Sequence, residues 1–233
     1  MRSLSGLAVG VGGLFALAIA AFAADPLDAV LARMDASAAA FRSMSANIKR
    51  VSHTAAINED SVDSGTIKLK RSRKGTPGDT RMIVDLTAPD RKTAALEGET
   101  FQIYLPKIKT VQIFDLGKKR NLLDQFLLLG FGTPGRDLSR AYATTFAGAE
   151  NVEGHQAAHL QLIPKSPEVL KQLRKVDLWI SDESGYPSQQ KFNQPSGDYT
   201  LVTFSDLKVN PNLPDSALKL QLPKGVKREY PQR

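Results

Sequence analysis

The chain of 233 residues contains no cysteine. It therefore forms no disulfide, offers no thiolate as a nucleophile or metal ligand, and has no cysteine to which a lipid anchor could be attached. After the first 24 residues, no apolar run approaches the ~18 residues that a membrane-spanning helix requires. The hydrophobic content of 42% is nevertheless sufficient for one sizeable core.

Motifs for catalysis are also lacking. The nucleophile-elbow pattern G-x-S-x-G does not occur. Acidic residues are scattered through turn-forming segments, where carboxylates commonly bond to nearby backbone amides. We therefore expect no enzyme activity and no cofactor. The acidic residues considered are Asp60, Asp63, Asp79, Asp90 and Glu97.

Residues 130–135, GFGTPG, match the dinucleotide-binding pattern G-x-G-x-x-G. That fingerprint requires a buried strand before it and a long helix after it, whereas patterns typical of antiparallel strands surround it here. Pro134 also removes a backbone N–H that could face a phosphate. We interpret these glycines as a flexible hinge between two short helices.

His155 and His159 are four residues apart, which on a helix would place both on one face for zinc binding. Their surroundings alternate as in a strand, where four residues separate the side chains by about 13 Å. We therefore expect no metal site. His53 is interpreted as an isolated strand histidine.

The first residues predict a signal peptide. Arg2 precedes a long run of small and apolar residues that ends in the cleavage pattern Ala21-Phe22-Ala23. The alternative is an uncleaved anchor helix. We expect residues 1–23 to be removed and residues 24–233 to form a single exported domain, most simply a monomer in the periplasm.

The charge balance favours anionic partners. Lys and Arg number 31 against 24 Asp and Glu, which gives a net charge of +7. Such a surface attracts lipid headgroups, acidic proteins or nucleic acid. Because an exported protein does not ordinarily meet nucleic acid, we expect no nucleic-acid partner.

Residues 65–116 hold five short segments of near-alternating polarity, separated by Gly, Pro and Asp. Alternation places the apolar residues of each segment on one face of a strand. Short separators predict hairpins, and hence a curved antiparallel sheet with one apolar face. With two residues of a later strand, the expected cavity lining is Ile67, Leu69, Met82, Val84, Phe101, Ile103, Val111, Ile113, Leu178 and Ile180.

An apolar face of this kind needs a cover. Residues 25–44 have apolar residues at helical spacing and predict an amphipathic N-terminal helix. Residues 121–130 form the most apolar segment after the signal peptide and predict a short, buried lid helix that ends at Gly130. The expected lid residues are Leu122, Leu123, Phe126, Leu127, Leu129 and Phe131.

Arg71 belongs to the densest basic cluster but differs from its neighbours. It shares strand parity with Ile67 and Leu69, so its side chain is expected on the apolar face. A buried guanidinium is costly unless its donors are satisfied, most simply by carbonyls of the covering helices. We therefore predict that Arg71 latches the lid.

The chain resembles the LolA/LolB superfamily of periplasmic carriers of outer-membrane lipoproteins, particularly the LolA type. The resemblance rests on GTIKLKR at residues 65–71, TAPD at 87–90, Gly98, YLP at 104–106 and the closing segment 215–226. Each motif is short, but their order and spacing cover nearly all of the chain after the signal peptide.

The resemblance implies an incomplete antiparallel β-barrel, mainly β with helices, whose open side is covered by helices and whose apolar cavity holds acyl chains. It also implies that Arg71 is the arginine that latches the lid. Ser72 stands where a proline commonly follows that arginine, Glu97 replaces an aspartate, and a helix over 165–174 is extra. These departures leave the cargo open.

Two functions follow from these expectations. The first is a shuttle that binds the acyl chains of lipoproteins or other lipids, receives them from an inner-membrane releasing complex and delivers them to an outer-membrane acceptor. The alternative is a regulatory module that senses lipid or lipoprotein on the same half-barrel.

Overall fold

The computed structural model describes residues 26–71, 80–117 and 120–231. The predicted signal peptide lies outside these residues, as does the separator KGTPGD at 74–79 between two of the predicted strands. No helix among the described residues is long and apolar enough to cross a membrane.

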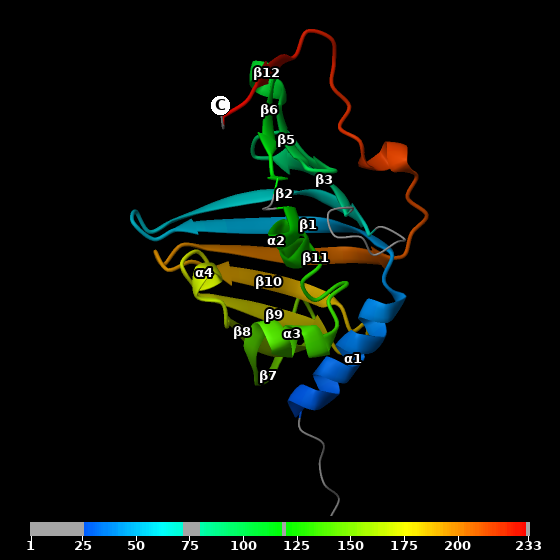
Figure 1. Ribbon diagram of the computed structural model, residues 1–233, viewed down its shortest axis with the longest axis vertical. Helices are drawn as coiled ribbons and strands as arrows, with labels where there is room; N and C mark the ends of the chain where they lie inside the picture. Colours follow the sequence, from blue (N-terminus) through cyan, green and yellow to red (C-terminus); the bar gives the residue numbers. More distant parts are fainter. Residues whose placement is uncertain (1–25, 72–79, 118–119, 232–233) are drawn as a thin grey trace, which may run out of the picture.

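The described strands form one open, twelve-stranded sheet in the order β12-β6-β5-β4-β3-β2-β1-β11-β10-β9-β8-β7 (Figure 1). All neighbours are antiparallel except β12, which pairs parallel to β6. The strands are β1 (Ser43–Thr54), β2 (Glu59–Lys70), β3 (Arg81–Ala88), β4 (Lys92–Glu97), β5 (Thr100–Leu105), β6 (Thr110–Asp115), β7 (Tyr142–Val152), β8 (His155–Pro164), β9 (Lys175–Ser181), β10 (Pro187–Asn193), β11 (Tyr199–Val209) and β12 (Lys227–Glu229).

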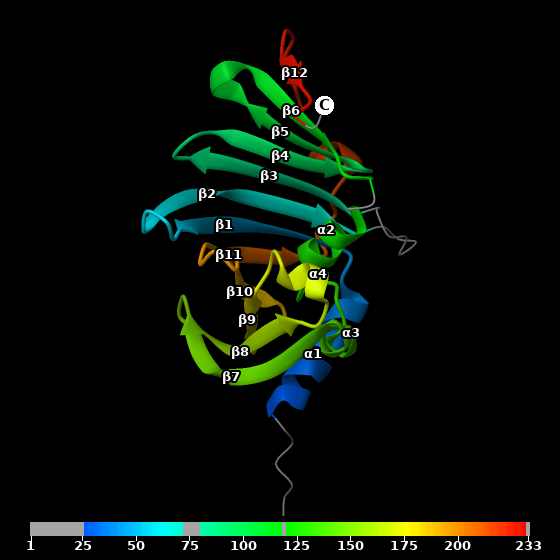
Figure 2. The same ribbon diagram turned by 60° about the vertical axis from the view of Figure 1, so that its left-hand side comes forward.

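The helices gather on one side of this curved sheet (Figure 2). They are α1 (Pro26–Ala40), α2 (Arg120–Leu127), α3 (Gly135–Ala141) and α4 (Pro167–Leu170). The predicted fold, an incomplete antiparallel barrel with a helical cover, is confirmed. Ser166 is the N-cap residue of α4, but its side chain makes no capping hydrogen bond.

Strand β2 begins earlier than its composition suggests. Residues 58–64, NEDSVDS, read as a polar loop because Asp and Ser are depleted in strands. In the structure β2 starts at Glu59 and pairs with β1 along its whole length, from Thr54 opposite Glu59 to Ser43 opposite Lys70. Pairing in the sheet overrides the local propensity.

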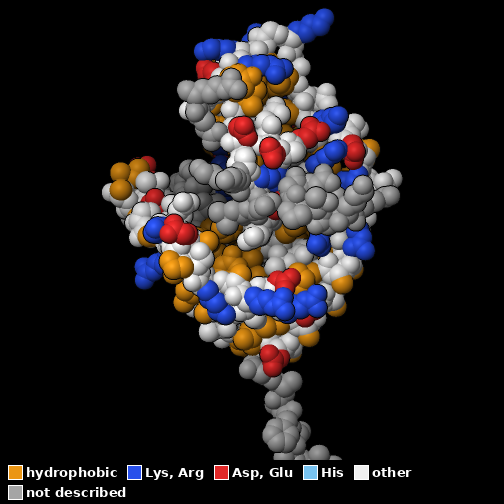
Figure 3. Space-filling view, viewed as in Figure 1, with side chains coloured by type: hydrophobic (Ala, Val, Ile, Leu, Met, Phe, Trp, Pro, Cys, Tyr) orange, Lys and Arg blue, Asp and Glu red, His pale blue; other side chains and the backbone are white. Residues whose placement is uncertain are grey.

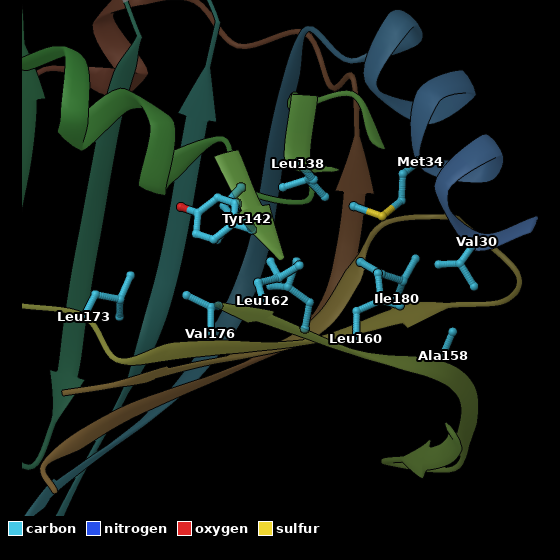
Figure 4. Close-up of a cluster of buried hydrophobic side chains, with 12 residues drawn as sticks. Val30, Met34, Leu138, Tyr142, Ala158, Leu160, Leu162, Leu173, Val176 and Ile180 are labelled. Carbon is cyan, nitrogen blue, oxygen red and sulfur yellow. The ribbon is translucent and has the colours of Figure 1, made fainter. Parts of the chain in front are cut away.

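One half of the sheet carries a closely packed core. Val30 and Met34 of α1 and Leu138 of α3 meet Leu160 and Ile180 of the sheet (Figure 4). Met34 is 1% exposed, and Leu138, Leu160 and Ile180 are 0% exposed. Side chains of α1 and α3 therefore fill the space above strands β7 to β9.

The opposite, outer face of β3 to β6 is crossed by the C-terminal segment. After β11 the chain forms the short 3-10 helix η3 (Asp215–Leu218), which contacts β3, and then reaches β6 through β12 (Figure 1). Asp215 pairs with Lys70 and Arg81 of the outer face at 2.8 and 3.1 Å. Leu218 is 1% exposed.

Val111 and Ile113 were expected to line the cavity, but they lie on the other face of the sheet. Register places Tyr104 opposite Val111 and Gln102 opposite Ile113, whereas Phe101 lies opposite Phe114. Opposed residues in an antiparallel pair share a face, so Val111 and Ile113 point to the outer face and Phe114 to the other. The turn at 106–109 changed the parity between β5 and β6, which alternation within one strand does not reveal.

Candidate functional site: an apolar cavity beneath helix α2

A cavity of about 1050 Å³ lies between the sheet and helices α2 and α4. Small-molecule pockets span roughly 300–1,000 Å³, so this cavity is at the top of that range. Figure 3 shows hydrophobic side chains within the hollow on this face. Its apolar lining comprises Met44, Ile48, Ile67, Leu69, Val84, Leu86, Leu123, Phe126, Leu127, Phe131, Val169, Leu173, Phe192, Pro195, Val202 and Phe204.

Helix α2 covers the cavity with one side of a short apolar segment. Leu123, Phe126 and Leu127 follow the i, i+3, i+4 spacing of a helix face, and all three line the cavity. Phe126 meets Phe192 of β10 edge to face, with ring centroids 6.3 Å apart. Phe131, just after α2, packs edge to face on Phe204 at 5.2 Å and closes one end of the cavity.

Arg71 lies where strand parity predicts, at the end of β2 beneath the loop that follows α2. Its Nη1 donates to the Gly132 carbonyl at 3.4 Å, and its backbone N–H donates to the Arg42 carbonyl at 2.8 Å. The guanidinium contact is long for a hydrogen bond. Among the described residues, the side chain thus joins the sheet to the covering loop through one long hydrogen bond.

The other end of α2 is fastened more firmly, by a residue that sequence reasoning missed. Arg120 is 2% exposed, and its Nε donates to the Gly98 carbonyl at 2.6 Å. Its Nη2 donates to the Thr80 carbonyl, and its Nη1 pairs with Asp124 one turn along the helix. The i, i+4 spacing of Arg120 and Asp124 was the available signal.

The cavity has a polar end. Register places Arg50 opposite Asp63 on the cavity side of β1 and β2, and Arg50 lines the cavity. Arg50 donates from Nε to one oxygen of Asp63 at 3.0 Å, while Lys92 Nζ lies 3.1 Å from the other. Burial alone would raise the pKa of Asp63, but the hydrogen bonds and charges of Arg50 and Lys92 outweigh it and hold that pKa below its usual value.

Sequence comparison links this geometry to known proteins. The chain is 24% identical over 217 residues to the outer-membrane lipoprotein carrier protein of Chromohalobacter salexigens, which covers 91% of this chain and 94% of that protein. The resemblance to the outer-membrane lipoprotein carriers is confirmed. No family model matches the chain.

Two solved structures show the same fold at low identity. An uncharacterized conserved protein from Thermus thermophilus aligns over 88% of this chain and 99% of its own, with a TM-score of 0.53 and 12% identity. MucB aligns over 84% of this chain with a TM-score of 0.50 and 16% identity. The chain spans 62% of the length of MucB.

Strand alternation predicted an apolar lining, and the structure brings part of the expected set together. Ile67, Leu69, Val84, Leu123, Phe126, Leu127 and Phe131 line the cavity. The side chain of Leu122 lies outside the described set. Phe101, Ile103 and Met82 lie on the cavity side of their strands but do not line the cavity.

Leu129, Leu178 and Ile180 are placed elsewhere. All three belong to the core beneath α1 and α3 and are at most 1% exposed. The strand pattern gave the correct face for Leu178 and Ile180, but the helices above that half of the sheet leave no cavity there. Residues that the sequence did not point to, including Val169 and Leu173 of the segment that seemed extra, line the cavity instead.

The glycines of GFGTPG serve close packing. A Cβ on Gly130, which has φ +79°, would lie 2.5 Å from Pro187 Cγ, and one on Gly135 would lie 2.6 Å from the Leu31 carbonyl oxygen. A Cβ on Gly132 would meet Phe41 Cδ1 at 3.3 Å. These contacts, rather than hinge freedom alone, explain the glycines.

The histidines lie on strands, on the outer face. His159 has Glu150 at 2.7 Å and Asp177 at 3.0 Å from its two ring nitrogens and stacks on Trp179. The Trp179 hydrogen bond, followed by that of His159, lowers the pKa of Glu150. Within the described ranges, no group of three or more His, Cys, Asp or Glu residues is arranged to hold a metal ion.

Proposed function

We propose that this protein is a periplasmic carrier that binds lipid acyl chains, such as those of lipoproteins, in the cavity beneath α2. The observation that carries the proposal is an apolar cavity of about 1050 Å³ whose cover is tied firmly at Arg120 and weakly at Arg71. The similarity to a protein named as an outer-membrane lipoprotein carrier supports the same function.

The energetics explain why such a cavity is needed. Each methylene removed from water contributes about 0.8 kcal/mol, so a chain of about fifteen methylenes gains ~12 kcal/mol on burial. A lipid therefore crosses an aqueous compartment only inside a protein. Release at the destination requires a cover that opens at moderate cost, as the long hydrogen bond between Arg71 and Gly132 would allow.

Export, a donor complex at the inner membrane and an acceptor at the outer membrane complete the proposal. Export rests on the cleavage pattern at residues 21–23. Binding and release require only that the cover move and that the apolar surface be shielded, so no catalytic group is involved.

The decisive experiment is native mass spectrometry of the protein purified without detergent from a periplasmic extract. We expect bound acylated molecules, identified after extraction. Ile67→Trp should fill the cavity and reduce the bound lipid severalfold, because Ile67 lines it. Thr66→Trp is the matched control, since Thr66 is exposed on the other face of the same strand and should retain lipid.

Equal retention by Ile67→Trp and Thr66→Trp would place the lipid elsewhere, and absence of lipid from the wild-type protein would refute the carrier. Recovery of one inner-membrane protein without acylated cargo would instead favour the regulatory module. MucB, which has been crystallised in complex with MucA(peri), has a related fold.

A further inference from the structure

The cavity is amphipathic along its length. Met44 and Leu69, which pair across β1 and β2, line its apolar end near Phe131. Arg50, six residues further along β1 and about 20 Å away at the rise of a strand, lines it at the β1–β2 hairpin end. A ligand that follows the strands therefore meets hydrocarbon first and a cation last.

A buried carboxylate organises the polar end. The side chain of Asp63 is 7% exposed and is held between Arg50 and Lys92, whose side chains are 35% and 31% exposed. Two cations and one carboxylate leave a net charge of +1. Asp63 thus fixes two partly exposed cations side by side, instead of neutralising a single one.

The guanidinium of Arg50 retains donor capacity. Among the described residues, its hydrogen bonds run from Nε and Nη2 to one oxygen of Asp63. A guanidinium has five N–H groups, and those of Nη1 are not engaged by these bonds. Lys92 Nζ likewise has three N–H donors, and its ion-pair partner among the described residues is Asp63.

We propose that Arg50 and Lys92 form a subsite for the phosphate of an anionic diacyl lipid whose chains occupy the cavity. This inference rests on the proposed function and specifies the class of cargo, a phospholipid with a net negative headgroup. Charge-assisted hydrogen bonds from a preorganised pair of cations favour phosphate over an uncharged glycerol headgroup. A plain structural ion pair would need only one cation for Asp63.

The test compares lipids that share chains and differ in headgroup. A pyrene-labelled diacylglycerol reports on the cavity, and dioctanoyl phosphatidylglycerol and dioctanoylglycerol compete for it. We expect the phosphatidylglycerol to bind about tenfold more tightly. Glycerol 3-phosphate, which has the phosphate without chains, should not displace the reporter, and displacement by it would identify a site for free phosphate instead.

The key variant is Arg50→Gln/Asp63→Asn/Lys92→Gln, which keeps amide hydrogen bonding and leaves no buried charge unpaired. It should bind both competitors equally. The matched control is Lys68→Gln on the outer face, which changes net charge by the same −1 and should keep the preference. Lys92→Gln alone leaves the Arg50–Asp63 pair intact and should reduce the preference partially, even if the triple variant folds poorly.

The outcomes separate the two proposals. If the wild-type protein binds the reporter but shows no headgroup preference, the phosphate subsite is refuted and the carrier stands. An equal loss of preference in Lys68→Gln would refute the subsite in favour of general surface charge. If the wild-type protein binds neither reporter nor competitors, both proposals are refuted.

Discussion

Two halves of the same sheet differ in what lies above them. Beneath α1 and α3, strands β7 to β9 are packed to full burial, as at Leu160, Leu178 and Ile180. Beneath α2, strands β1 to β3 together with β10 and β11 face a cavity. Both halves present alternating apolar residues, so the covering helices, not the strands, decide where a core ends and a binding site begins.

We expect the largest effect on the free energy of unfolding from a substitution that removes the attachment of α2 to the sheet. Arg120→Leu should lower the free energy of unfolding by ~3–5 kcal/mol, because it removes the positive charge that is paired with the buried carboxylate of Asp124. Urea unfolding of the lipid-free protein measures this. Arg140→Leu is the control, since the side chain of Arg140 is 78% exposed on α3, where it pairs with Asp137. A similar loss in both variants would contradict the role of Arg120.

The filled and hollow halves should respond differently to truncation. Leu178→Ala should cost about 2–5 kcal/mol of unfolding free energy, because a fully buried side chain leaves a cavity. Ile67→Ala should cost clearly less, because Ile67 already borders empty space. Equal losses in urea unfolding would mean that the hollow half is as tightly packed as the filled half.

The contribution of the polar end of the cavity to the stability of the protein should depend on pH. The folded pKa of Asp63 is lowered, so its contribution to stability is present above the unfolded value of 3.8 and is lost as pH falls through the lower folded pKa. The difference in Tm between wild type and Asp63→Asn should therefore shrink as the pH is reduced below about 4. A difference that stays constant down to pH 2 would show that Asp63 is not stabilised by Arg50 and Lys92.

The smallest expected change in stability is at the predicted latch. Arg71→Leu should alter the free energy of unfolding by less than about 1 kcal/mol, because it removes one long hydrogen bond. It should nevertheless change the amount of lipid retained, measured by native mass spectrometry. Lys68→Leu, on the outer face of the same strand, should leave lipid retention unaltered. Unchanged retention in Arg71→Leu would remove Arg71 from the mechanism.

Local patterns were enough to predict the five strands from β2 to β6, the cover at α2 and the face on which Arg71 lies. Each depends on a period of two or 3.6 residues within one segment. They failed for Val111 and Ile113 because the turn at 106–109 shifts the parity between neighbouring strands. Local patterns also did not predict that Arg50 and Lys92 lie beside Asp63, because these two residues belong to strands that are far apart in the sequence.

The sequence by itself determined a mainly β fold with one apolar face, short covering helices and no cysteine chemistry. These properties follow from residue type and spacing along the chain. Only the tertiary structure decided that Leu178 and Ile180 are core and Ile67 and Val84 border a cavity, because side chains from α1 and α3 occupy the space above the first pair and not above the second. Whether a cavity remains depends on how the helices pack against the sheet, and the alternation of residues within one strand does not predict that packing.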